Sequence, residues 1–566
     1  MKIGIAQLNP LIGDLEGNST KILQACIAAA KQNADLVITP ELSLWGYPPR
    51  DLLLETKRYN YQTEILNNIA NILKIKAPNI ALLVGVIEQA TDSQVPKLFN
   101  SLALIKNGVW EVVGRKQLLP TYDVFDEKRY FRPAKKTSII KIETSQKSWS
   151  IGLTICEDLW VEEKIQGKRL KGNDPIRQLY GSKIDLLLNL SASPFSYTKE
   201  SVRQKLAAKA AKQINCPVVY LNQVGGNDEL IFDGSSFVVD NHGKIICSLP
   251  KYVEHLEIWD SSAIPNNNQT FYSQTSPQER LFRALVLGVK DYIYKCGFNS
   301  TILGLSGGID SSLVATIAVA ALGSEKVSGI LMPSPWSSIE SVEDALELAK
   351  RLEIKTRTIP IKDLMQGFDI TLTSVIEKKL KSLTSENLQA RIRGTLLMAI
   401  SNQEQHLLLS TGNKSELAMG YCTLYGDMNG GLSVIGDLYK TSVFELCEWL
   451  DSENSYNCRK SMGLVCTEEL IGLKIRNKPP SAELRPGQLD SDSLPEYDLL
   501  DPILKDLIEE RLNLPELLKK GYNNHLIERV QSLLKKAEFK RRQAPPLLKV
   551  SNQAFGSGWR IPIAAK

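Results

Sequence analysis

Glu41, Lys116 and Cys156 each follow an apolar segment with the alternation of a β-strand. Amide cleavage needs a nucleophile, a proton carrier and a cation for the developing oxyanion. A thiol, a carboxylate and an ammonium group supply these roles without a histidine, which suits a chain with only four histidines. At a strand-to-helix turn, helix N–H groups can stabilise the Cys156 thiolate. A single buried cysteine is more often inert packing, so the prediction of amide hydrolysis depends on the three residues together.

In the second half of the chain, an apolar strand at 301–305 leads into a glycine- and serine-rich loop that begins a helix. The loop consists of Gly304, Leu305, Ser306, Gly307, Gly308, Ile309, Asp310, Ser311 and Ser312. Glycines let a phosphate approach the backbone closely, and a helix N-terminus presents unpaired N–H groups to it. Asp310 would repel a bare phosphate, so we expect it to bind Mg²⁺. The loop lacks the Gly-Lys-Ser/Thr of a Walker-type loop, and the alternative is a tightly packed helix cap.

Short strands and helices that could position the thiol site alternate through the first half. We expect strands at 2–8, 36–39, 80–87, 98–106, 110–114, 151–155, 184–190 and 217–222. Helical periodicity falls at 19–32, 60–73 and 199–214. Asn107-Gly108 is a strong hairpin signal, and 240–244 has the composition of a second hairpin turn. Hairpins mixed with αβ units predict a layered α/β sandwich.

The second half alternates strands and helices more regularly. Strands are expected at 301–305, 327–332, 356–361 and 406–410, separated by helices at 311–321, at 341–352 and in a long stretch that ends near 403. This order predicts a doubly wound parallel sheet with helices on both faces. The segment around 263–278 is polar and rich in proline, asparagine and serine, which favours a linker. We therefore expect domains at 1–262 and 279–566.

The bulk composition excludes several classes of protein. The net charge of +5 over 566 residues is too small to indicate binding to nucleic acid or to a membrane surface. No apolar run approaches the roughly 18 residues that a membrane helix needs, and the N-terminus resembles a strand more than a targeting peptide. Nine scattered cysteines without a CxxC pair favour reduced thiols in the cytoplasm over structural zinc or disulfides.

The loop at 303–312 resembles the ATP pyrophosphatase loop of enzymes that adenylate a substrate. Further motifs follow in an order that resembles the NAD synthetase family over essentially all of 279–566. These motifs are NLQARIR (387–393), STGNKSE (410–416), GYCTLYGD (420–427), DLYKT (437–441), KPPSAEL (478–484) and KRRQ (540–543). Trp336 stands where a tyrosine is expected in a serine-rich loop.

The resemblance to NAD synthetases implies roles for individual residues. Thr411 and Lys440 would contact ATP together with the 304–312 loop, and Arg391 would lie near the triphosphate. Asp310 and Glu416 would hold Mg²⁺. Asn387, Glu416 and Lys540 would contact deamido-NAD.

The first half resembles the nitrilase superfamily, and in particular its glutaminase branch in NAD synthetases. The resemblance rests on TPELSLWGY (39–47), GRKQLLP (114–120) and IGLTICEDLW (151–160), and it implies an α-β-β-α sandwich. By this likeness Glu41 is the general base, Cys156 the nucleophile and Lys116 the oxyanion stabiliser, and Glu127 positions them. Tyr122, Glu157, Ser193 and Lys199 would hold glutamine. Lys199 stands where relatives can have an arginine, and a lysine lacks the bidentate fork.

The two resemblances together imply an enzyme in which glutamine-derived ammonia attacks an adenylated dinucleotide. The product would be NAD, with ATP consumed as a substrate, and the family suggests a homo-oligomer paired through the synthetase domains. Three alternatives stay open: an amidotransferase for another carboxylate or a purine, a stand-alone amidase, and a nucleotide-sensing scaffold with decayed sites. The last predicts losses among the motif residues, and the sequence has none.

Overall fold

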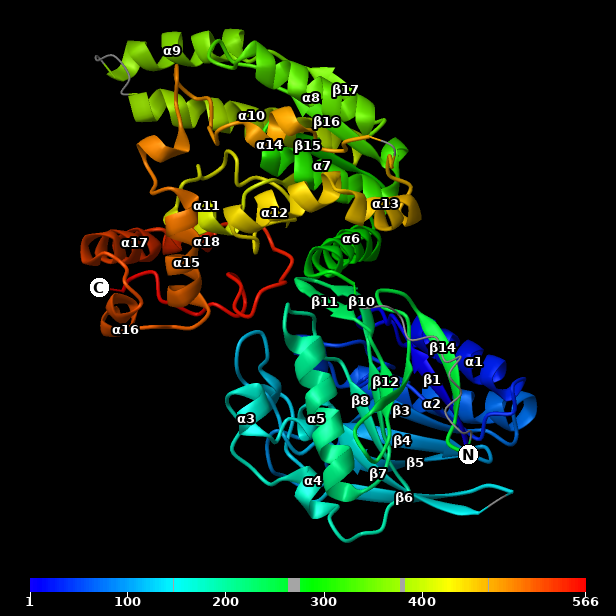
Figure 1. Cartoon of the computed structure of the whole chain (residues 1–566). Coiled ribbons are helices and arrows are strands. Elements are labelled where there is room, and N and C mark those ends of the chain that lie inside the picture. Colours follow the sequence, from blue (N-terminus) through cyan, green and yellow to red (C-terminus); the bar gives the residue numbers. More distant parts are fainter. Residues whose placement is uncertain (146, 263–274, 377–381, 467, 566) are drawn as a thin grey trace. The chain divides into compact units, whose positions relative to one another are not determined.

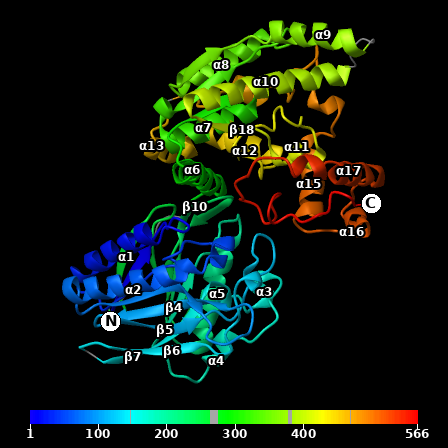
Figure 2. The same cartoon turned by 180° about the vertical axis from the view of Figure 1, so that it is seen from behind.

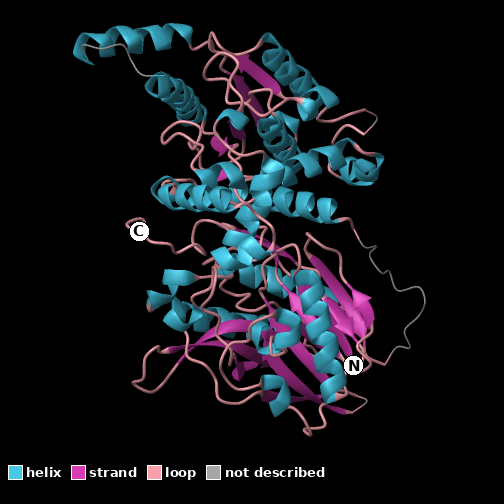
Figure 3. Cartoon of the chain, turned by 60° about the vertical axis from the view of Figure 1, so that its left-hand side comes forward, coloured by secondary structure: helices cyan, strands magenta, loops and turns pink. Residues whose placement is uncertain are grey.

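The computed structural model describes residues 1–145, 147–262, 275–376, 382–466 and 468–565. Residue contacts divide the chain into unit 1, Met1–Gln274, and unit 2, Thr275–Lys566. Strands dominate unit 1 and helices dominate unit 2 (Figure 3). Residues 263–274 of the expected linker lie outside the described residues, and α6 begins at Pro277. No helix of the described chain has the length and apolar character needed to cross a bilayer.

Unit 1 contains two six-stranded sheets and a separate hairpin. The first sheet has the order β14 (His255–Asp260), β1 (Lys2–Gln7), β2 (Leu36–Ile38), β3 (Ala81–Gln89), β4 (Leu98–Lys106) and β5 (Val109–Arg115). The second has the order β13 (Ile245–Ser248), β12 (Phe237–Val239), β9 (Val218–Asn222), β8 (Leu186–Ser191), β7 (Ser148–Ile155) and β6 (Ser138–Glu143). The hairpin pairs β10 (Val224–Asn227) with β11 (Leu230–Asp233). The helices are α1 (Leu15–Ala30), α2 (Lys57–Lys76), α3 (Glu163–Gln166), α4 (Pro175–Gln178) and α5 (Lys199–Ile214), with 3-10 turns η1 (Arg50–Leu54), η2 (Glu127–Arg129) and η3 (Cys156–Leu159).

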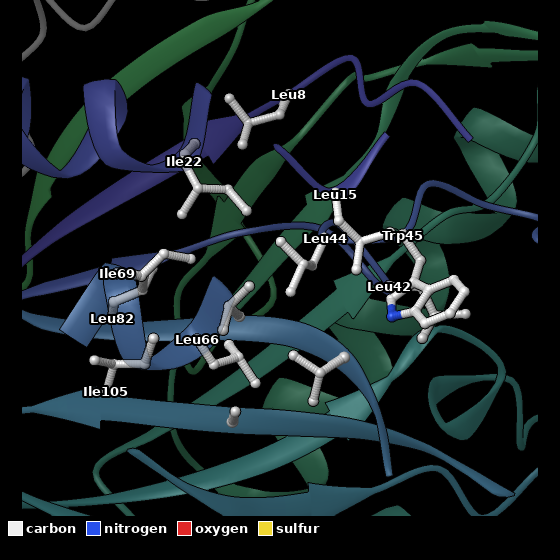
Figure 4. Packing of buried hydrophobic residues seen from close by; sticks show 14 of the residues in the cluster. Leu8, Leu15, Ile22, Leu42, Leu44, Trp45, Leu66, Ile69, Leu82 and Ile105 are labelled. Atoms are coloured by element: carbon white, nitrogen blue, oxygen red, sulfur yellow. The ribbon is translucent and has the colours of Figure 1, made fainter. Parts of the chain in front are cut away.

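Apolar residues on the strands pack the two sheets face to face. Ile5 of β1 and Leu153 of β7 belong to one buried cluster between the sheets, as alternation of side chains along a strand allows. The outer face of the first sheet is covered by α1 and α2, which lie side by side (Figure 2), and Ile22, Leu66 and Leu82 pack there (Figure 4). Helix α5 covers the second sheet. The predicted α-β-β-α sandwich is therefore confirmed.

Unit 2 contains a five-stranded sheet in which all neighbouring strands are parallel. Its order is β17 (Lys355–Thr358), β16 (Val327–Leu331), β15 (Thr301–Gly304), β18 (Leu407–Ser410) and β19 (Leu432–Ser433). The strand order reverses between β15 and β18, and open α/β sheets bind ligands beside the carboxyl ends of such strands. This confirms the doubly wound sheet and places the loops after β15 and β18 at its switch point.

The helices of unit 2 form two sets along the sequence, one within residues 277–477 and a carboxyl-terminal one within residues 497–541 (Figure 1). The first set is α6 (Pro277–Lys295), α7 (Ile309–Leu322), α8 (Ile339–Arg351), α9 (Lys362–Ile376), α10 (Ser382–Glu404), α11 (Lys414–Met419), α12 (Lys440–Asp451), α13 (Tyr456–Ser461) and α14 (Leu473–Asn477). The second is α15 (Tyr497–Ile508), α16 (Leu514–Lys519), α17 (Asn524–Lys536) and α18 (Glu538–Arg541). Short 3-10 turns are η4 (Ser324–Lys326), η5 (Glu453–Ser455) and η6 (Asp490–Asp492).

Candidate functional sites

The thiol site of unit 1 forms where strands of both sheets end. Glu41 follows β2, Lys116 follows β5, and Cys156 begins η3 directly after β7. The Lys116 Nζ lies 2.6 Å from Glu41 Oε1 and 2.7 Å from Glu127 Oε1. All four side chains are buried, and they are close enough for Glu41, Lys116 and Glu127 to shift the pKa of Cys156. The structure thus brings together the three residues predicted to cleave an amide and the glutamate predicted to position them.

The electrostatics of this site keep the thiol protonated at rest. Burial and the Glu41 carboxylate raise the pKa of Cys156 well above its ordinary range, although Lys116 opposes them. Burial disfavours the charged form of Lys116, but Glu127 and Glu41 outweigh it and raise the pKa of Lys116. The thiol lies at the start of η3, a 3-10 turn of four residues, and it is buried beside a carboxylate. A base must deprotonate Cys156, and Glu41 is the carboxylate that most strongly affects it.

Several groups that fix these carboxylates were missed in the sequence. Asn100 Nδ2 donates to Glu41 Oε1 at 2.7 Å, and the backbone N–H of Ala192 donates to Glu41 Oε2 at 3.1 Å. The Tyr47 hydroxyl donates to Glu127 Oε1 at 2.7 Å. A signal existed for Asn100, because an amide stands among the mostly apolar residues of strand β4. Buried polar side chains of this kind require partners, so Asn100 could have been connected with the site.

The residues predicted to hold glutamine lie around the same site. The Tyr122 hydroxyl bonds both carboxylate oxygens of Glu157 at 3.1 Å. Burial raises the pKa of Glu157 to about 7, while Lys116, Tyr122 and Lys199 oppose the shift. The Lys199 ammonium also lies 5.4 Å from the centre of the Phe125 ring. The Ser193 N–H donates to Asn222 Oδ1 at 2.8 Å. A carboxylate, a hydroxyl and an ammonium group can together recognise an α-amino acid.

A second candidate site is a cavity in unit 2 at the carboxyl ends of β15 and β18. Among the predicted residues, its lining contains Gly304, Leu305, Ser306, Gly308, Ile309, Asp310, Ser311, Thr411, Glu416 and Lys440. Gly307 has a φ of +77°, and a Cβ there would lie 2.1 Å from the Ser341 carbonyl oxygen. Ser312 turns inward and donates to the Gly308 carbonyl at 2.8 Å. Gly307 and Ser312 therefore shape the loop from behind the cavity wall.

Charged groups from three segments meet beside this loop. Lys440 forms an ion pair with Asp310, and Asn413 Nδ2 donates to Asp310 Oδ1 at 3.1 Å. Burial and the neighbouring Asp310 raise the pKa of Glu416 well above its ordinary range. Two carboxylates that repel each other fit a divalent cation, and Mg²⁺ is usually held by one or two carboxylates plus phosphates. No cluster of three or more potential metal-binding side chains occurs among the residues that the structure describes.

Of the predicted dinucleotide contacts, Glu416 lines this cavity, whereas Asn387 and Lys540 lie outside its lining. Asn387 Oδ1 accepts from the Thr423 hydroxyl at 3.0 Å, and Lys540 Nζ donates to the carbonyls of Gly420 and Cys422 at 2.8 and 2.7 Å. Both side chains thus hold the segment 420–423, of which residues 421 and 422 line the cavity. Arg391 Nε donates to the Leu424 carbonyl at 3.2 Å. Asn387, Lys540 and Arg391 therefore support the cavity wall.

Two acidic residues near Lys440 were missed in the sequence. Asp490 lines the cavity and accepts from the Tyr497 hydroxyl at 2.8 Å. Asp501 accepts from the Ser415 hydroxyl at 2.6 Å and from the Thr441 N–H at 2.9 Å, which ties helix α12 to the Glu416 segment. Neither stands in a segment with a distinctive local pattern, so the sequence offered no signal for them.

Trp336 is 46% exposed, and it does not line the cavity. The Trp336 N–H donates to the Ser334 hydroxyl at 3.2 Å, within the serine-rich loop that follows β16.

Comparison with known proteins extends over the whole chain. The carbon-nitrogen hydrolase family model matches residues 2–260, and the NAD synthase family model matches residues 281–544. A curated glutamine-dependent NAD(+) synthetase of Synechocystis sp. is 50% identical, over 99% of this chain and 98% of that protein. One from Thermotoga maritima is 39% identical, over 100% and 98%.

Solved structures give the same result for the fold. The structure of glutamine-dependent NAD+ synthetase from Acinetobacter baumannii in complex with ADP superposes with a TM-score of 0.74 at 36% identity, covering 99% of this chain and 98% of that one. A glutamine-dependent NAD(+) synthetase from Cytophaga hutchinsonii superposes with a TM-score of 0.79 at 23% identity, covering 100% and 98%.

Proposed function

Because the chain belongs to the family of glutamine-dependent NAD(+) synthetases, we propose that it converts deamido-NAD to NAD with glutamine as nitrogen donor and ATP as energy source. The observation that carries this proposal is the presence of two separate sites with the required chemistry, one in each unit. The unit 1 site suits amide hydrolysis, and the unit 2 cavity suits a nucleotide. An amidotransferase for another acceptor is disfavoured by relatives that match over nearly the full chain.

In unit 1, Glu41 removes the proton of the Cys156 thiol, and the thiolate attacks the amide carbon of glutamine. The oxyanion forms beside the Lys116 ammonium, which the ion pairs with Glu41 and Glu127 hold in place. Glu41 returns the proton to the leaving nitrogen, so ammonia departs and a thioester remains. Glu41 then deprotonates a water molecule, which releases glutamate and restores the thiol. Glu157, Tyr122, Ser193 and Lys199 hold the amino-acid end of glutamine.

In unit 2, the nicotinate carboxylate of deamido-NAD attacks the α-phosphate of ATP, and pyrophosphate leaves. The loop 304–312 and Thr411 hold ATP, and Lys440 offsets the charge that develops on the leaving phosphates. Asn387, Glu416 and Lys540 position the dinucleotide. Asp310 and Glu416 would hold Mg²⁺, which neutralises phosphate charge when bound. Ammonia then attacks the acyl carbon of the adenylate, AMP departs, and NAD forms.

Replacing Cys156 with alanine tests the division of labour between the units. We expect glutamine-driven NAD formation to fall by at least about a thousandfold, because the nucleophile is lost. NAD formation driven by ammonium chloride should be unchanged, since the unit 2 site keeps all its residues. Both rates are measured as NAD produced from deamido-NAD and ATP.

The control for this variant is Cys247→Ala, which removes another buried thiol of unit 1 and should retain both activities. Equal loss of the glutamine- and ammonia-driven rates in Cys156→Ala would contradict the assignment. So would normal glutamine-driven synthesis.

We further propose a homo-oligomer that pairs through unit 2. Support comes from α9, in which no described residue is buried, although its apolar residues Leu364, Phe368 and Val375, which share one face at helical spacing, are 43%, 44% and 76% exposed. A helix of this length is marginal without packing, and exposed apolar patches mark contact surfaces. A second copy of the same helix would cover these side chains.

The nine free thiols fit the cytoplasm, which we propose as the compartment.

A further inference from the structure

Asp158 is a buried carboxylate that accepts hydrogen bonds from backbone N–H groups on both sides of the thiol site. It lies two residues after Cys156 and is 2% exposed. Its Oδ1 accepts from the N–H groups of Gln117 and Leu118 at 3.0 and 2.8 Å, and its Oδ2 accepts from the N–H of Ile155 at 3.1 Å. One side chain therefore connects the residues just after Lys116 with the residue just before Cys156.

The two segments that Asp158 connects come from different sheets. Lys116 follows β5 of the first sheet, and Cys156 follows β7 of the second. Neither position is fixed by regular secondary structure. The Lys116 N–H bonds the Asn100 carbonyl at 2.9 Å, but the chain turns away from the sheet directly afterwards. The relative placement of ammonium and thiol thus depends on contacts between the strand ends.

Cys156 also needs support because its backbone is strained. Its φ is +47°, a region that residues other than glycine seldom adopt. Such a conformation persists only when the surrounding structure fixes it. The bond from Ile155 to Asp158 restrains the peptide that precedes the strained residue, and Ile155 itself keeps the extended backbone of β7.

We propose that Asp158 is a positioning residue that sets the Cys156 thiol at its working distance from Lys116. The proposal rests on the proposed glutaminase function. In that reaction the thiolate must reach the amide carbon while the ammonium faces the oxygen, and a misplacement of about 1 Å can lower the rate about a hundredfold. Asp158 acts through the backbone and does not itself contact glutamine in this assignment.

The geometry requires an acceptor at every contact of Asp158. Burial raises the pKa of Asp158 to about 6, against the N–H groups that favour its charged form, so the group is ionised at neutral pH. An ionised carboxylate has only acceptor sites, which match three N–H donors. An asparagine amide would keep one acceptor oxygen and would point an NH₂ group at a backbone N–H.

Asp158→Asn tests the proposal in the full-length chain. We expect kcat for glutamate release from glutamine to fall about 10- to 100-fold, with KM for glutamine close to that of the parent. Ammonia-driven NAD formation should be unchanged. The buried thiols of Cys26 and Cys216 should stay protected from iodoacetamide under native conditions, as mass spectrometry of the alkylated protein would show. A purely structural role would expose these thiols.

Asp240→Asn is the matched control, because Asp240 Oδ1 also accepts from two backbone N–H groups, at 2.9 and 2.8 Å, in the exposed turn between β12 and β13. It should leave kcat and KM unchanged. Two results for Asp158→Asn would overturn the proposal: a kcat equal to that of the parent, whether or not KM rises, or alkylation of Cys26 and Cys216 in step with lost activity.

Asp158→Glu is the second variant if the amide variant does not fold. It keeps the charge and both acceptor oxygens but displaces them by one methylene. We therefore expect kcat to fall, KM for glutamine to stay unchanged, and Cys26 and Cys216 to remain protected from iodoacetamide. Full activity would overturn the proposal. A parent chain without any glutaminase activity would instead refute the proposed function itself, which separates the two failures.

Discussion

Glu157 is a buried carboxyl group whose charge changes near neutral pH. Burial raises its pKa to about 7, and Lys116 is the strongest opposing influence. In our assignment its ionised form attracts the α-ammonium group of glutamine. Because the pKa is raised, the binding-competent form predominates above about pH 7 and is lost as the pH falls below that value. A bound ammonium would favour the ionised form and lower the pKa again.

The pH dependence of glutaminase activity should follow from this residue. We expect kcat/KM for glutamine to rise with pH through about 7 and then to level off. The same rise in kcat should occur at lower pH, because kcat depends on the pKa of Glu157 in the enzyme–glutamine complex. Glu157→Gln should raise KM roughly ten- to a hundredfold, as expected for loss of a charged hydrogen bond of about 1.5–3 kcal/mol. Initial rates of glutamate release across pH 5–9 (about the stable range) measure both effects.

The control is Glu163→Gln, which neutralises an exposed carboxylate at the start of α3 and should leave KM unchanged. A Glu157→Gln variant with the parent's KM would show that Glu157 does not bind the substrate's ammonium group.

At the scale of elements, the loop after β15 depends on how closely α8 approaches it. Gly307 combines a φ of +77° with a Ser341 carbonyl oxygen 2.1 Å from where a Cβ would stand. Ser341 is in the first turn of α8. The packing of α8 therefore allows only glycine at this position. The position of the 304–312 loop thus depends directly on the position of α8.

Gly307→Ala should impair NAD formation in unit 2 and spare glutamine hydrolysis in unit 1, which is the reverse of the effect expected for Cys156→Ala. We expect ammonia-driven NAD formation to fall at least about tenfold, because an alanine at positive φ costs more than about 1 kcal/mol even without overlap. Glutamate release in unit 1 should be unaffected. Gly323→Ala is the control: its φ is +86°, but nothing lies within 4 Å of the added Cβ, so it carries the strain alone. Equal losses in both variants would mean that the contact with Ser341 has no role.

Most elements could be predicted from apolar periodicity, and the failures have physical causes. The predicted strand at 98–106 and helix at 199–214 have the bounds of β4 and α5. The strand expected at 356–361 is Lys355–Thr358, an edge strand whose mostly exposed residues carry little periodicity. Strands β6 and β14 were missed; each is an edge strand of its sheet, and most of its residues are exposed or half-buried. The long helical stretch is divided into α9 and α10, and residues 377–381 between them lie outside the described residues.

The sites were less predictable than the elements. The triad and the phosphate loop carry local motifs, whereas Asn100, Asp158 and Asp501 act through contacts with distant segments. A sequence presents such residues singly, and only the fold brings them to their partners.

At the scale of the whole molecule, the exposed helix α9 should govern assembly. Phe368→Glu combined with Val375→Glu places two charges on one face of α9, which we propose a second copy covers. We expect a smaller sedimenting species at the same concentration, because buried unpaired charges oppose association. Analytical ultracentrifugation measures the mass directly.

Ile75→Glu is the control, since Ile75 is an isolated apolar residue of α2 with 80% exposure, and it should leave the mass unchanged. A Phe368/Val375 variant with the parent's mass would rule out α9 as the contact.

Strands β1 and β14 are antiparallel neighbours, with Lys2 opposite Asp260, and the amino group of Met1 donates to the Ser261 hydroxyl at 3.0 Å. The first and last described strands of unit 1 therefore lie side by side. A domain whose ends lie close together can be fused to another domain without a change in its own backbone. Such a domain also tolerates circular permutation. The Asn107-Gly108 turn between β4 and β5 offers the natural point for new termini. This geometry would allow unit 1 to be transferred between proteins as an intact domain.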